Sequence, residues 1–162
     1  MRIFLIVLLS LVPLISYAQP DRGEVRSGNR AYEKGEVEKA EIEYRRGLEQ
    51  NPDSFFARYN LGNALYKKGN SQEAEKIVTQ VPDSLLNEGA RTKIFHNLGN
   101  YTLDQKKYSE AIEHYKNSLR INPADMETKA NLAYAQKMLK NEQDKQNKDQ
   151  NKDNKDNKDN KD

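Results

Sequence analysis

The side chains with the widest chemical repertoire in this 162-residue chain are two histidines, His96 and His114. They fall in separate predicted helices, and no paired-histidine zinc motif, phosphate-binding glycine loop or nucleophile elbow accompanies them. The chain has no cysteine, which excludes disulfide and thiol chemistry. We therefore expect no enzyme activity, no metal and no cofactor, and we place His114 on the solvent face of its helix. An enzymatic function would require a cleft that brings His96 together with carboxylates of perturbed pKa.

Asparagine is the other residue type whose spacing suggests chemistry. Asn29, Asn63 and Asn100 are 34 and 37 residues apart, and each directly follows a glycine. An asparagine side chain offers donors and an acceptor, so a column of three is suited to pairing with the backbone of an extended peptide. Such pairing requires that the three residues lie on neighbouring elements of one repeating structure.

A repeat with that spacing runs through the middle of the chain. Asn60-Leu61-Gly62-Asn63 recurs as Asn97-Leu98-Gly99-Asn100, and self-similarity at roughly 20–50 residues indicates a stacked repeat architecture. Proline closes the first and last units at Pro52 and Pro123. Three kinds of residue recur with this same spacing: a glycine, an alanine, and a bulky residue four positions after the alanine. They are Gly28, Gly62 and Gly99; Ala40, Ala74 and Ala111; and Tyr44, Val78 and Tyr115.

Each unit predicts two helices joined by a short turn. Gly35 and Gly69 mark two of the turns, since glycine is the usual residue just past a helix end, and Lys106 takes that place in the third. A glycine inside a helix costs about 1 kcal/mol relative to alanine, so its recurrence requires a close contact, which we assign to the alanine of the second helix. In the second unit, Pro82 shortens the second helix, and Asp83-Ser84 caps a long first helix for the third unit over residues 85–103.

This pattern resembles the tetratricopeptide repeat (TPR) family, whose units carry small residues at two fixed positions and a proline near their end. The resemblance implies an all-α fold, a TPR α-solenoid of three helix-turn-helix repeats at residues 21–54, 55–91 and 92–125. A capping helix over residues 125–140 completes a domain at 19–140, because a stack needs a terminal element with a polar outer side. Its predicted apolar face consists of Ala130, Ala133, Met138 and Leu139.

In TPR proteins the first helices line a concave groove that binds peptides or proteins, and the resemblance implies the same here. The asparagines would pair with the backbone of the guest, and the aromatic residues would supply contact area typical of interface hot spots. A clamp for a C-terminal carboxylate fits only in part, because Asn97 stands in place of an arginine and Val25 in place of a lysine. The predicted peptide-binding residues are Asn29, Phe56, Tyr59, Asn63, Tyr66, Lys93, His96 and Asn100.

The two ends of the chain differ from the repeats. Arg2 precedes an apolar run over residues 3–15, and Ser16-Tyr17-Ala18 places small residues before Gln19, which predicts a cleaved signal peptide at 1–18. The run is shorter than the roughly 20 residues that span a membrane, and a retained anchor is the alternative. Residues 141–162 contain no apolar residue, so we predict a disordered tail. The protein is thus expected to be exported to the periplasm or cell envelope.

The signal segment, the tail rich in Asn, Lys and Asp, and residues 122–135 together resemble the TPR components (BatC) of Bat aerotolerance systems. That resemblance implies an envelope scaffold that works with von Willebrand factor A-type membrane proteins. The small net charge of +2 gives no case for nucleic acid, and no small-molecule substrate is predicted. The alternative function is a structural or membrane-anchored assembly factor whose disordered tail is the functional element.

Overall fold

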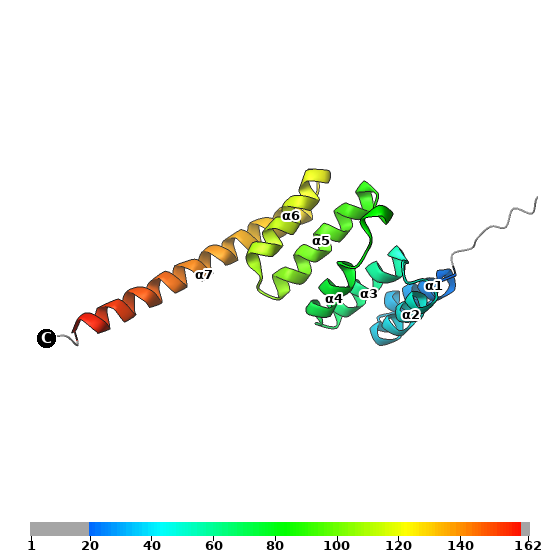
Figure 1. Cartoon of the computed structure of the whole chain (residues 1–162), viewed down its shortest axis with the longest axis horizontal. Helices are drawn as coiled ribbons and strands as arrows, with labels where there is room; N and C mark the ends of the chain where they lie inside the picture. The colour runs from blue at the N-terminus through cyan, green and yellow to red at the C-terminus, as the bar shows by residue number, and fades with distance from the viewer. Residues whose placement is uncertain (1–19, 160–162) are drawn as a thin grey trace, which may run out of the picture.

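The computed structural model describes the backbone of residues 20–159 and the side chains of residues 20–148. These residues form helices that stack side by side in chain order, and the last helix projects from the stack (Figure 1). The predicted all-α fold is confirmed, whereas the predicted signal peptide at 1–18 lies outside the described residues. The elements are α1 (Arg22–Glu33), α2 (Val37–Gln50), α3 (Phe55–Lys67), α4 (Ser71–Val78), the 3-10 turn η1 (Asp83–Leu85), α5 (Glu88–Asp104), α6 (Tyr108–Ile121) and α7 (Met126–Asp159).

The short turns between paired helices depend on residues in the left-handed conformation. Gly35 and Gly69 both have a φ of 79°, which glycine adopts without a steric penalty. Lys106 takes the same place in the third turn with a φ of 61°, where a side chain costs about 1 kcal/mol or more. Ser54 and Asn70 then begin α3 and α4, and the side chain of each accepts a backbone N–H three residues further on.

The glycines inside the first helices make room for a large side chain of the second helix. A Cβ on Gly28 would lie 2.5–2.9 Å from three ring atoms of Tyr44, and a Cβ on Gly99 would overlap the ring of Tyr115. The predicted contact with the alanine of the second helix is present in the second unit, where the Ala74 carbonyl oxygen would lie 3.6 Å from a Cβ on Gly62, but in every unit the nearest atom belongs to the bulky residue. The bulky residue one turn after the alanine lies on the same helix face, and it is this residue that fills the space above the glycine.

The connection between α4 and α5 is longer than the other connections between units. α4 ends at Val78, as Pro82 predicts, and η1 follows it. α5 begins at Glu88 rather than at residue 85, which corrects the predicted start. The cap is Asn87, whose side chain accepts the backbone N–H of Ala90.

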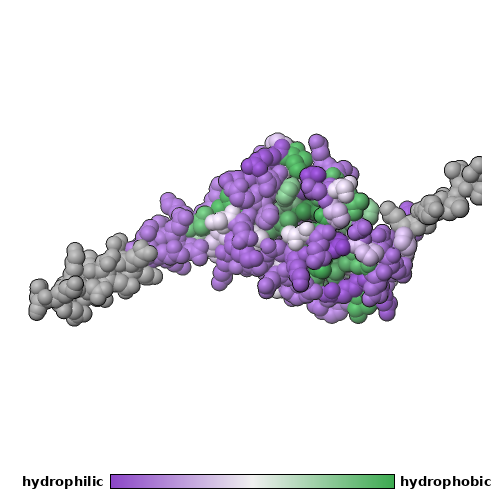
Figure 2. Space-filling model, in the orientation of Figure 1, coloured by the Kyte–Doolittle hydropathy of each residue, from purple (hydrophilic) through white to green (hydrophobic). Residues whose placement is uncertain are grey.

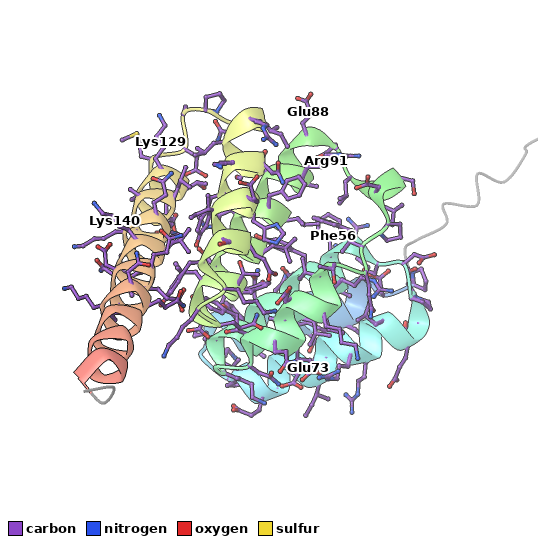
Figure 3. All side chains as sticks on the ribbon, turned by 60° about the vertical axis from the view of Figure 1, so that its left-hand side comes forward. Phe56, Glu73, Glu88, Arg91, Lys129 and Lys140 are labelled. Carbon is purple, nitrogen blue, oxygen red and sulfur yellow. The ribbon has the colours of Figure 1, made fainter. Side chains whose placement is uncertain are left out.

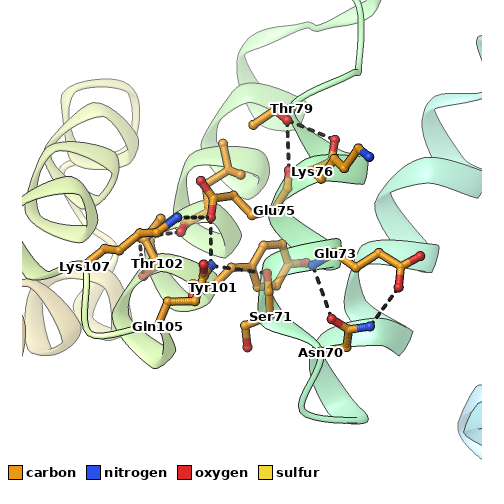
Figure 4. Close-up of polar contacts among 12 residues, drawn as sticks. Asn70, Ser71, Glu73, Glu75, Lys76, Thr79, Tyr101, Thr102, Gln105 and Lys107 are labelled. Carbon is orange, nitrogen blue, oxygen red and sulfur yellow. Dashed lines mark hydrogen bonds and ion pairs between the residues drawn. The ribbon is translucent and has the colours of Figure 1, made fainter.

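Polar side chains tie the shortened α4 to the turn between α5 and α6. The Glu75 carboxylate accepts a hydrogen bond from Nε2 of Gln105 at 2.7 Å and from Nζ of Lys107 at 3.0 Å (Figure 4). Burial by itself raises the pKa of Glu75, but these two donors bring the pKa below its ordinary value. The second unit is thus attached to the third although its second helix is short.

The first part of α7 covers the end of the stack. Its outer side is polar, and Lys129 and Lys140 project from it away from the other helices (Figure 3). The apolar face is rotated from the predicted one, because Ala130 and Ala133 are exposed. Residues at three- and four-residue spacing share a helix face, and those that lie against the stack are Thr128, Leu132, Ala135 and Leu139.

The end of α7 extends beyond its last packed residue. Disorder is predicted from residue 141, whereas the described backbone is helical as far as Asp159. Neither proline nor glycine follows Pro123, so the segment contains no helix breaker, and Asp144 and Lys148 have the spacing of a favourable helix pair. The described surface of this extension is hydrophilic (Figure 2). Among residues 20–159, no helix is both long enough and apolar enough to cross a membrane.

Candidate functional site

The asparagines of the first and third units each accept a hydrogen bond from a buried tyrosine of their own unit. The hydroxyl of Tyr44 donates to Oδ1 of Asn29 at 2.8 Å, and the hydroxyl of Tyr115 donates to Oδ1 of Asn100 at 2.8 Å. Burial raises the pKa of Tyr44 to about 12, so its hydroxyl keeps the proton that it donates. The ring that covers each glycine is thus fixed at its far end by the asparagine that follows that glycine.

The second unit reaches the same arrangement with a tyrosine from the third unit. Val78 stands where the other units have tyrosine, and it has no hydroxyl. Tyr101 on α5 inserts its ring instead and donates to Oδ1 of Asn63 at 2.9 Å. Tyr101 is only 1% exposed, and burial raises its pKa far above the ordinary value. Asn63 therefore has the same kind of donor as Asn29 and Asn100, although this donor comes from a different helix.

A second donor to each of these carbonyl oxygens is an asparagine of the next helix in the row. The links run from α3 to α1, from α5 to α3 and from α7 to α5, and we name the six residues the asparagine ladder. The Nδ2 to Oδ1 distances are 2.9 Å for Asn60 to Asn29, 2.6 Å for Asn97 to Asn63 and 3.0 Å for Asn131 to Asn100.

In the asparagine ladder, Asn29 and Asn63 leave their amide nitrogens, rather than their carbonyl oxygens, for a bound molecule. An amide oxygen has two lone pairs, and here a tyrosine and an asparagine occupy both. Between residues 20 and 148, no protein group accepts a hydrogen bond from Nδ2 of Asn29 or Asn63, and neither nitrogen is among the buried polar atoms left without a partner. The sequence predicts that each asparagine offers a donor and an acceptor, but Asn29 and Asn63 offer a bound molecule only their N–H donors.

His96 links α5 to the start of α7. Its Nδ1 lies 2.6 Å from Oγ1 of Thr128, and its Nε2 lies 3.0 Å from Nδ2 of Asn100. The Thr128 hydroxyl donates to Asp125 at 2.6 Å, so it accepts from His96, which assigns the proton of a neutral imidazole to Nδ1. Hydrogen bonds from Thr128 hold the pKa of Asp125 below its usual range. His96 therefore has partners on both ring nitrogens within the protein.

His114 lies half-buried on α6, which corrects the predicted position on a solvent face. Its Nδ1 is buried and has no hydrogen-bond partner among the described residues. Burial lowers the pKa of His114, against the opposing influence of Glu75, Glu110 and Glu113. In the described part of the chain, no three His, Asp or Glu side chains are placed to hold a metal ion.

The predicted aromatic residues lie along the same side of α3 as Asn63, at three- and four-residue spacing. Phe56 is 54% exposed and Tyr66 is 38% exposed. Tyr59 is partly buried and stacks on Phe55, with ring centroids 5.7 Å apart. Phe56 and Tyr66 are therefore the two that offer free contact area, and the predicted Lys93 on α5 is also exposed.

Two cavities open beside the asparagine ladder. One has a volume of about 200 Å³ and lies between α1 and α3. The other has a volume of about 350 Å³ and is lined by residues of α3, α5, α6 and α7. Both cavities lie along the row of first helices. We name the surface that contains them the groove and define it by residues that line them: Asn29, Tyr32, Asn63, Tyr66, Asn100, Tyr134 and Met138.

Tyr134 is a groove residue that the sequence reasoning placed in the cap and did not select. It is 54% exposed and lines the larger of the two groove cavities together with Tyr66. A signal was present, because Asn131-Leu132-Ala133-Tyr134 occupies the register of Asn-Leu-Gly-Asn, 34 residues after Asn97. α7 is therefore the first helix of a further unit as well as the cap of the stack.

Helix pairs stacked in register, with small residues at their contacts and a groove along the first helices, define a TPR-like α-solenoid. Residues 28–69 match the family described as TPR repeat, and residues 92–122 match the family described as tetratricopeptide repeat. These matches support the predicted resemblance to TPR proteins. The segment between them, residues 70–91, contains the shortened α4 and the long connection to α5.

Two characterised proteins share parts of this sequence. The type IV pilus assembly protein PilF of Pseudomonas aeruginosa is 33% identical over 84 residues, which are 51% of this chain and 32% of that protein. The protein STIP1 homolog of Dictyostelium discoideum is 24% identical over 122 residues, which are 73% of this chain and 22% of that protein. The chain thus spans only 32% and 22% of the lengths of these relatives.

Solved TPR structures share the fold. The first TPR domain of Spaghetti (RPAP3), bound to the HSP90 peptide SRMEEVD, has a TM-score of 0.69 and 21% identity, and the match covers 75% of this chain and 94% of that one. The second TPR domain of human RPAP3, in complex with the HSP70 peptide SGPTIEEVD, has a TM-score of 0.63 and 25% identity, with coverage of 72% and 98%. The predicted α-solenoid is confirmed by these likenesses.

Proposed function

We propose that this protein is a binding adaptor whose groove takes an extended segment of a partner protein. The observation that carries the proposal is the asparagine ladder, which fixes two amide groups, those of Asn29 and Asn63, with their N–H donors free. N–H donors repeated along a groove suit the carbonyl groups of an extended peptide. Exposed Tyr66 and Tyr134 add aromatic contact area, which is common at interface hot spots. Peptides bound to two of the similar TPR structures support this kind of function.

We place the adaptor in the cell envelope, as an exported scaffold in an assembly like the Bat aerotolerance system. The apolar run over residues 3–15, the small residues before Gln19 and the resemblance of residues 122–135 and the tail support this placement. In such an assembly the partners are von Willebrand factor A-type membrane proteins. The similarity over 84 residues to a type IV pilus assembly protein also supports a role in an envelope assembly.

The test is crosslinking of envelope proteins to the chain that begins at Gln19, with the wild type compared with a Tyr66→Ala/Tyr134→Ala double variant. Both side chains line one cavity, and Tyr66 also packs on the ring of Tyr101 with centroids 5.2 Å apart, so the melting curve must be compared as well as the binding. Interface hot spots cost about 2 kcal/mol or more on truncation, which is roughly a thirtyfold loss of affinity. We expect the double variant to lose its partner while its helical melting curve stays close to that of the wild type.

The control for this test is Glu43→Ala on α2, outside the groove. Glu43 is half-buried and forms an ion pair with the exposed Arg46 at 3.0 Å, so the melting curve of this variant is recorded together with its binding. Asn63→Ala is unsuitable as a groove variant, because it would also remove the acceptor of the buried Tyr101 hydroxyl. Capture that is equal for the wild type and the double variant would show that the groove is not the binding site.

A second candidate function places the activity in the tail. The observation in its favour is the polar continuation of α7 after Leu139, the last residue that packs on the stack. A helix without an apolar face gains little from the stack, and a partner is one element that could hold it in place. Deletion of residues 141–162 separates the two functions, since capture survives the deletion if the groove binds the partner and is lost if the tail does.

A further inference from the structure

A second pair of cavities lies beyond the groove, near the N-terminal ends of α1, α3 and α5. Phe56 lines both of them. The larger has a volume of about 610 Å³ and is also lined by Phe55, Leu85, Ala90 and Lys93. The smaller has a volume of about 260 Å³ and is lined by residues of α1. We name the two cavities together the Phe56 cleft, and its volume falls in the range of pockets that enclose a ligand.

The irregular second unit creates this cleft. The connections from α2 to α3 and from α6 to α7 are short, whereas the connection from α4 to α5 runs over residues 79–87 and includes η1. Leu85 in η1 is 47% exposed and faces the same cavity as Phe56, which is 54% exposed. In Figure 3, Phe56 lies near the middle of the stack, whereas Glu88 and Arg91 lie at the outer end of α5. Two large apolar side chains that share one exposed hollow are a mark of an interaction site.

Cationic side chains flank the apolar centre on both sides. Arg22 and Arg26 line the smaller cavity and Lys93 lines the larger, and none of the three forms an ion pair among the described residues. Two carboxylates also line the cleft, Asp21 and the exposed Asp53. The Asp21 carboxylate is buried and accepts hydrogen bonds from two side chains near the turn between α2 and α3, so it is already occupied. Three accessible cations thus face one accessible carboxylate, that of Asp53, and the balance of accessible charge in the cleft is positive.

We propose that the Phe56 cleft binds an acidic segment of the partner protein in which a bulky apolar side chain stands between carboxylates. The apolar side chain packs against Phe56 and Leu85, whose exposed surface it covers. Carboxylates on one side of it pair with Arg22 and Arg26, and carboxylates on the other side pair with Lys93. Complementary charge around an apolar anchor selects the partner and fixes its register. This inference rests on the proposed function, because Phe56 lies on the same side of α3 as Tyr66 and the cleft extends the groove along that helix.

The test uses a fluorescein-labelled peptide with phenylalanine at its centre and two aspartates on either side, with both ends blocked. Blocked ends exclude binding through a terminal carboxylate. We expect the chain that begins at Gln19 to bind this peptide in fluorescence anisotropy, with an affinity that falls as salt screens the charges. A peptide with alanine at the centre, and a peptide with lysine in place of aspartate, should bind at least about tenfold more weakly if both features contribute as anchors.

Two pairs of variants locate the binding. Phe56→Ala should weaken binding roughly tenfold or more, and its matched control is Ile42→Ala, which truncates a side chain of similar exposure, 51%, on α2. Lys93→Gln should weaken binding and reduce the salt dependence, and its matched control is Lys129→Gln on the outer side of α7. All four substitutions replace exposed side chains, so each variant should remain folded, and circular dichroism is the check.

Three results would overturn the assignment. The first is a peptide that does not bind, and the second is binding that Phe56→Ala leaves unchanged. The third is a concentration-dependent dimer in sedimentation that Phe56→Ala abolishes, which would assign the cleft to a second copy of the chain. Envelope capture that still depends on Tyr66 and Tyr134 would, in each case, show that the groove function stands and only the cleft assignment fails.

Discussion

Replacement of Gly28 by alanine tests the contact that sets the spacing of the paired helices. The new Cβ would lie 2.5–2.9 Å from three ring atoms of Tyr44, closer than carbon atoms tolerate. The ring has little freedom to retreat, since Tyr44 is 2% exposed and its hydroxyl is bound to Asn29 at 2.8 Å. Gly23 in the same helix is the matched control, because a Cβ there would meet nothing within 4 Å.

Three free-energy contributions decide whether Gly28→Ala stabilises or destabilises the protein. Alanine gains about 1 kcal/mol over glycine inside a helix. Overpacking of a filled site costs about 1–3 kcal/mol, and displacement of the Tyr44 hydroxyl from its acceptor adds about 1–3 kcal/mol if the hydroxyl stays buried. Gly28→Ala should therefore destabilise the protein by about 1–5 kcal/mol, whereas Gly23→Ala should be neutral or stabilising by up to about 1 kcal/mol.

Thermal melts followed by circular dichroism at 222 nm measure this difference. A gap of a few kcal/mol between the two variants corresponds to a difference in Tm on the order of 10 °C for a domain of this size. A Tyr44→Leu background should remove most of the penalty, which a double-mutant cycle reports as a coupling free energy. If both glycine variants raise the Tm alike, the ring of Tyr44 does not require the glycine and the packing argument is wrong.

Three further predictions concern the ladder, the half-buried histidine and the processing of the chain. Asn63→Ala should cost about 1–3 kcal/mol in urea unfolding because it orphans the Tyr101 hydroxyl, and adding Tyr101→Phe should recover part of that loss; a double variant less stable than the single one would contradict this. The folded pKa of His114 lies below its ordinary value of 6.5, so its contribution to stability is complete above pH 6.5 and is lost as the pH falls through the folded pKa. Urea midpoints at pH 7.5 and 5.5 should therefore differ more for the wild type than for His114→Gln, and equal differences would refute that assignment. Intact-mass analysis of the protein from the envelope fraction should give a chain that begins at Gln19, and a mass that retains residues 1–18 would instead indicate an uncleaved anchor.

The fold is predictable from the sequence because the repeat constrains it at several positions at once. A glycine, an alanine and a closing proline recur with one spacing, and only stacked helix pairs place all of them at equivalent contacts. The spacing also shows where the second unit departs from the pattern, since Pro82 arrives early. What the spacing leaves open is which side chain meets each glycine, because the alanine and the bulky residue share one helix face.

The candidate site is less predictable, because its chemistry depends on contacts between units. The residue types identify Asn29, Asn63 and Asn100, and their spacing places them in one row. The sequence does not show that each carbonyl oxygen is already bound twice. The donor to Asn63 is the clearest case, since Tyr101 is 38 residues away and has no counterpart in the other units. The supply of this tyrosine donor by α5 instead of α4 follows from side-chain packing, which a periodic pattern does not encode.

The start of α5 and the position of His114 illustrate a second limit. Asp83-Ser84 and Asn87 are both acceptable caps, and the choice depends on where the chain can pair the first N–H groups of α5. Glu113 and His114 are adjacent polar residues on α6, and neither residue type indicates by itself which of the two is buried. The packing of α6 against the rest of the stack half-buries His114 and leaves Glu113 exposed. Local sequence signals such as these are compatible with more than one helix start or burial state until tertiary contacts are known.

The links of the asparagine ladder all cross from one unit to the next, and this bears on how the array comes apart. In stacked repeats the free energy divides into a term for each unit and a term for each boundary between neighbours. The ladder hydrogen bonds and the inserted Tyr101 belong to the boundary terms, so separation of two units breaks these hydrogen bonds and exposes the buried ring of Tyr101 to water. Strong boundary terms favour unfolding of the whole array in one step over fraying unit by unit. Native-state hydrogen exchange should then report similar opening free energies for the core amides of α1, α3 and α5, instead of a gradient from the ends of the stack to its centre.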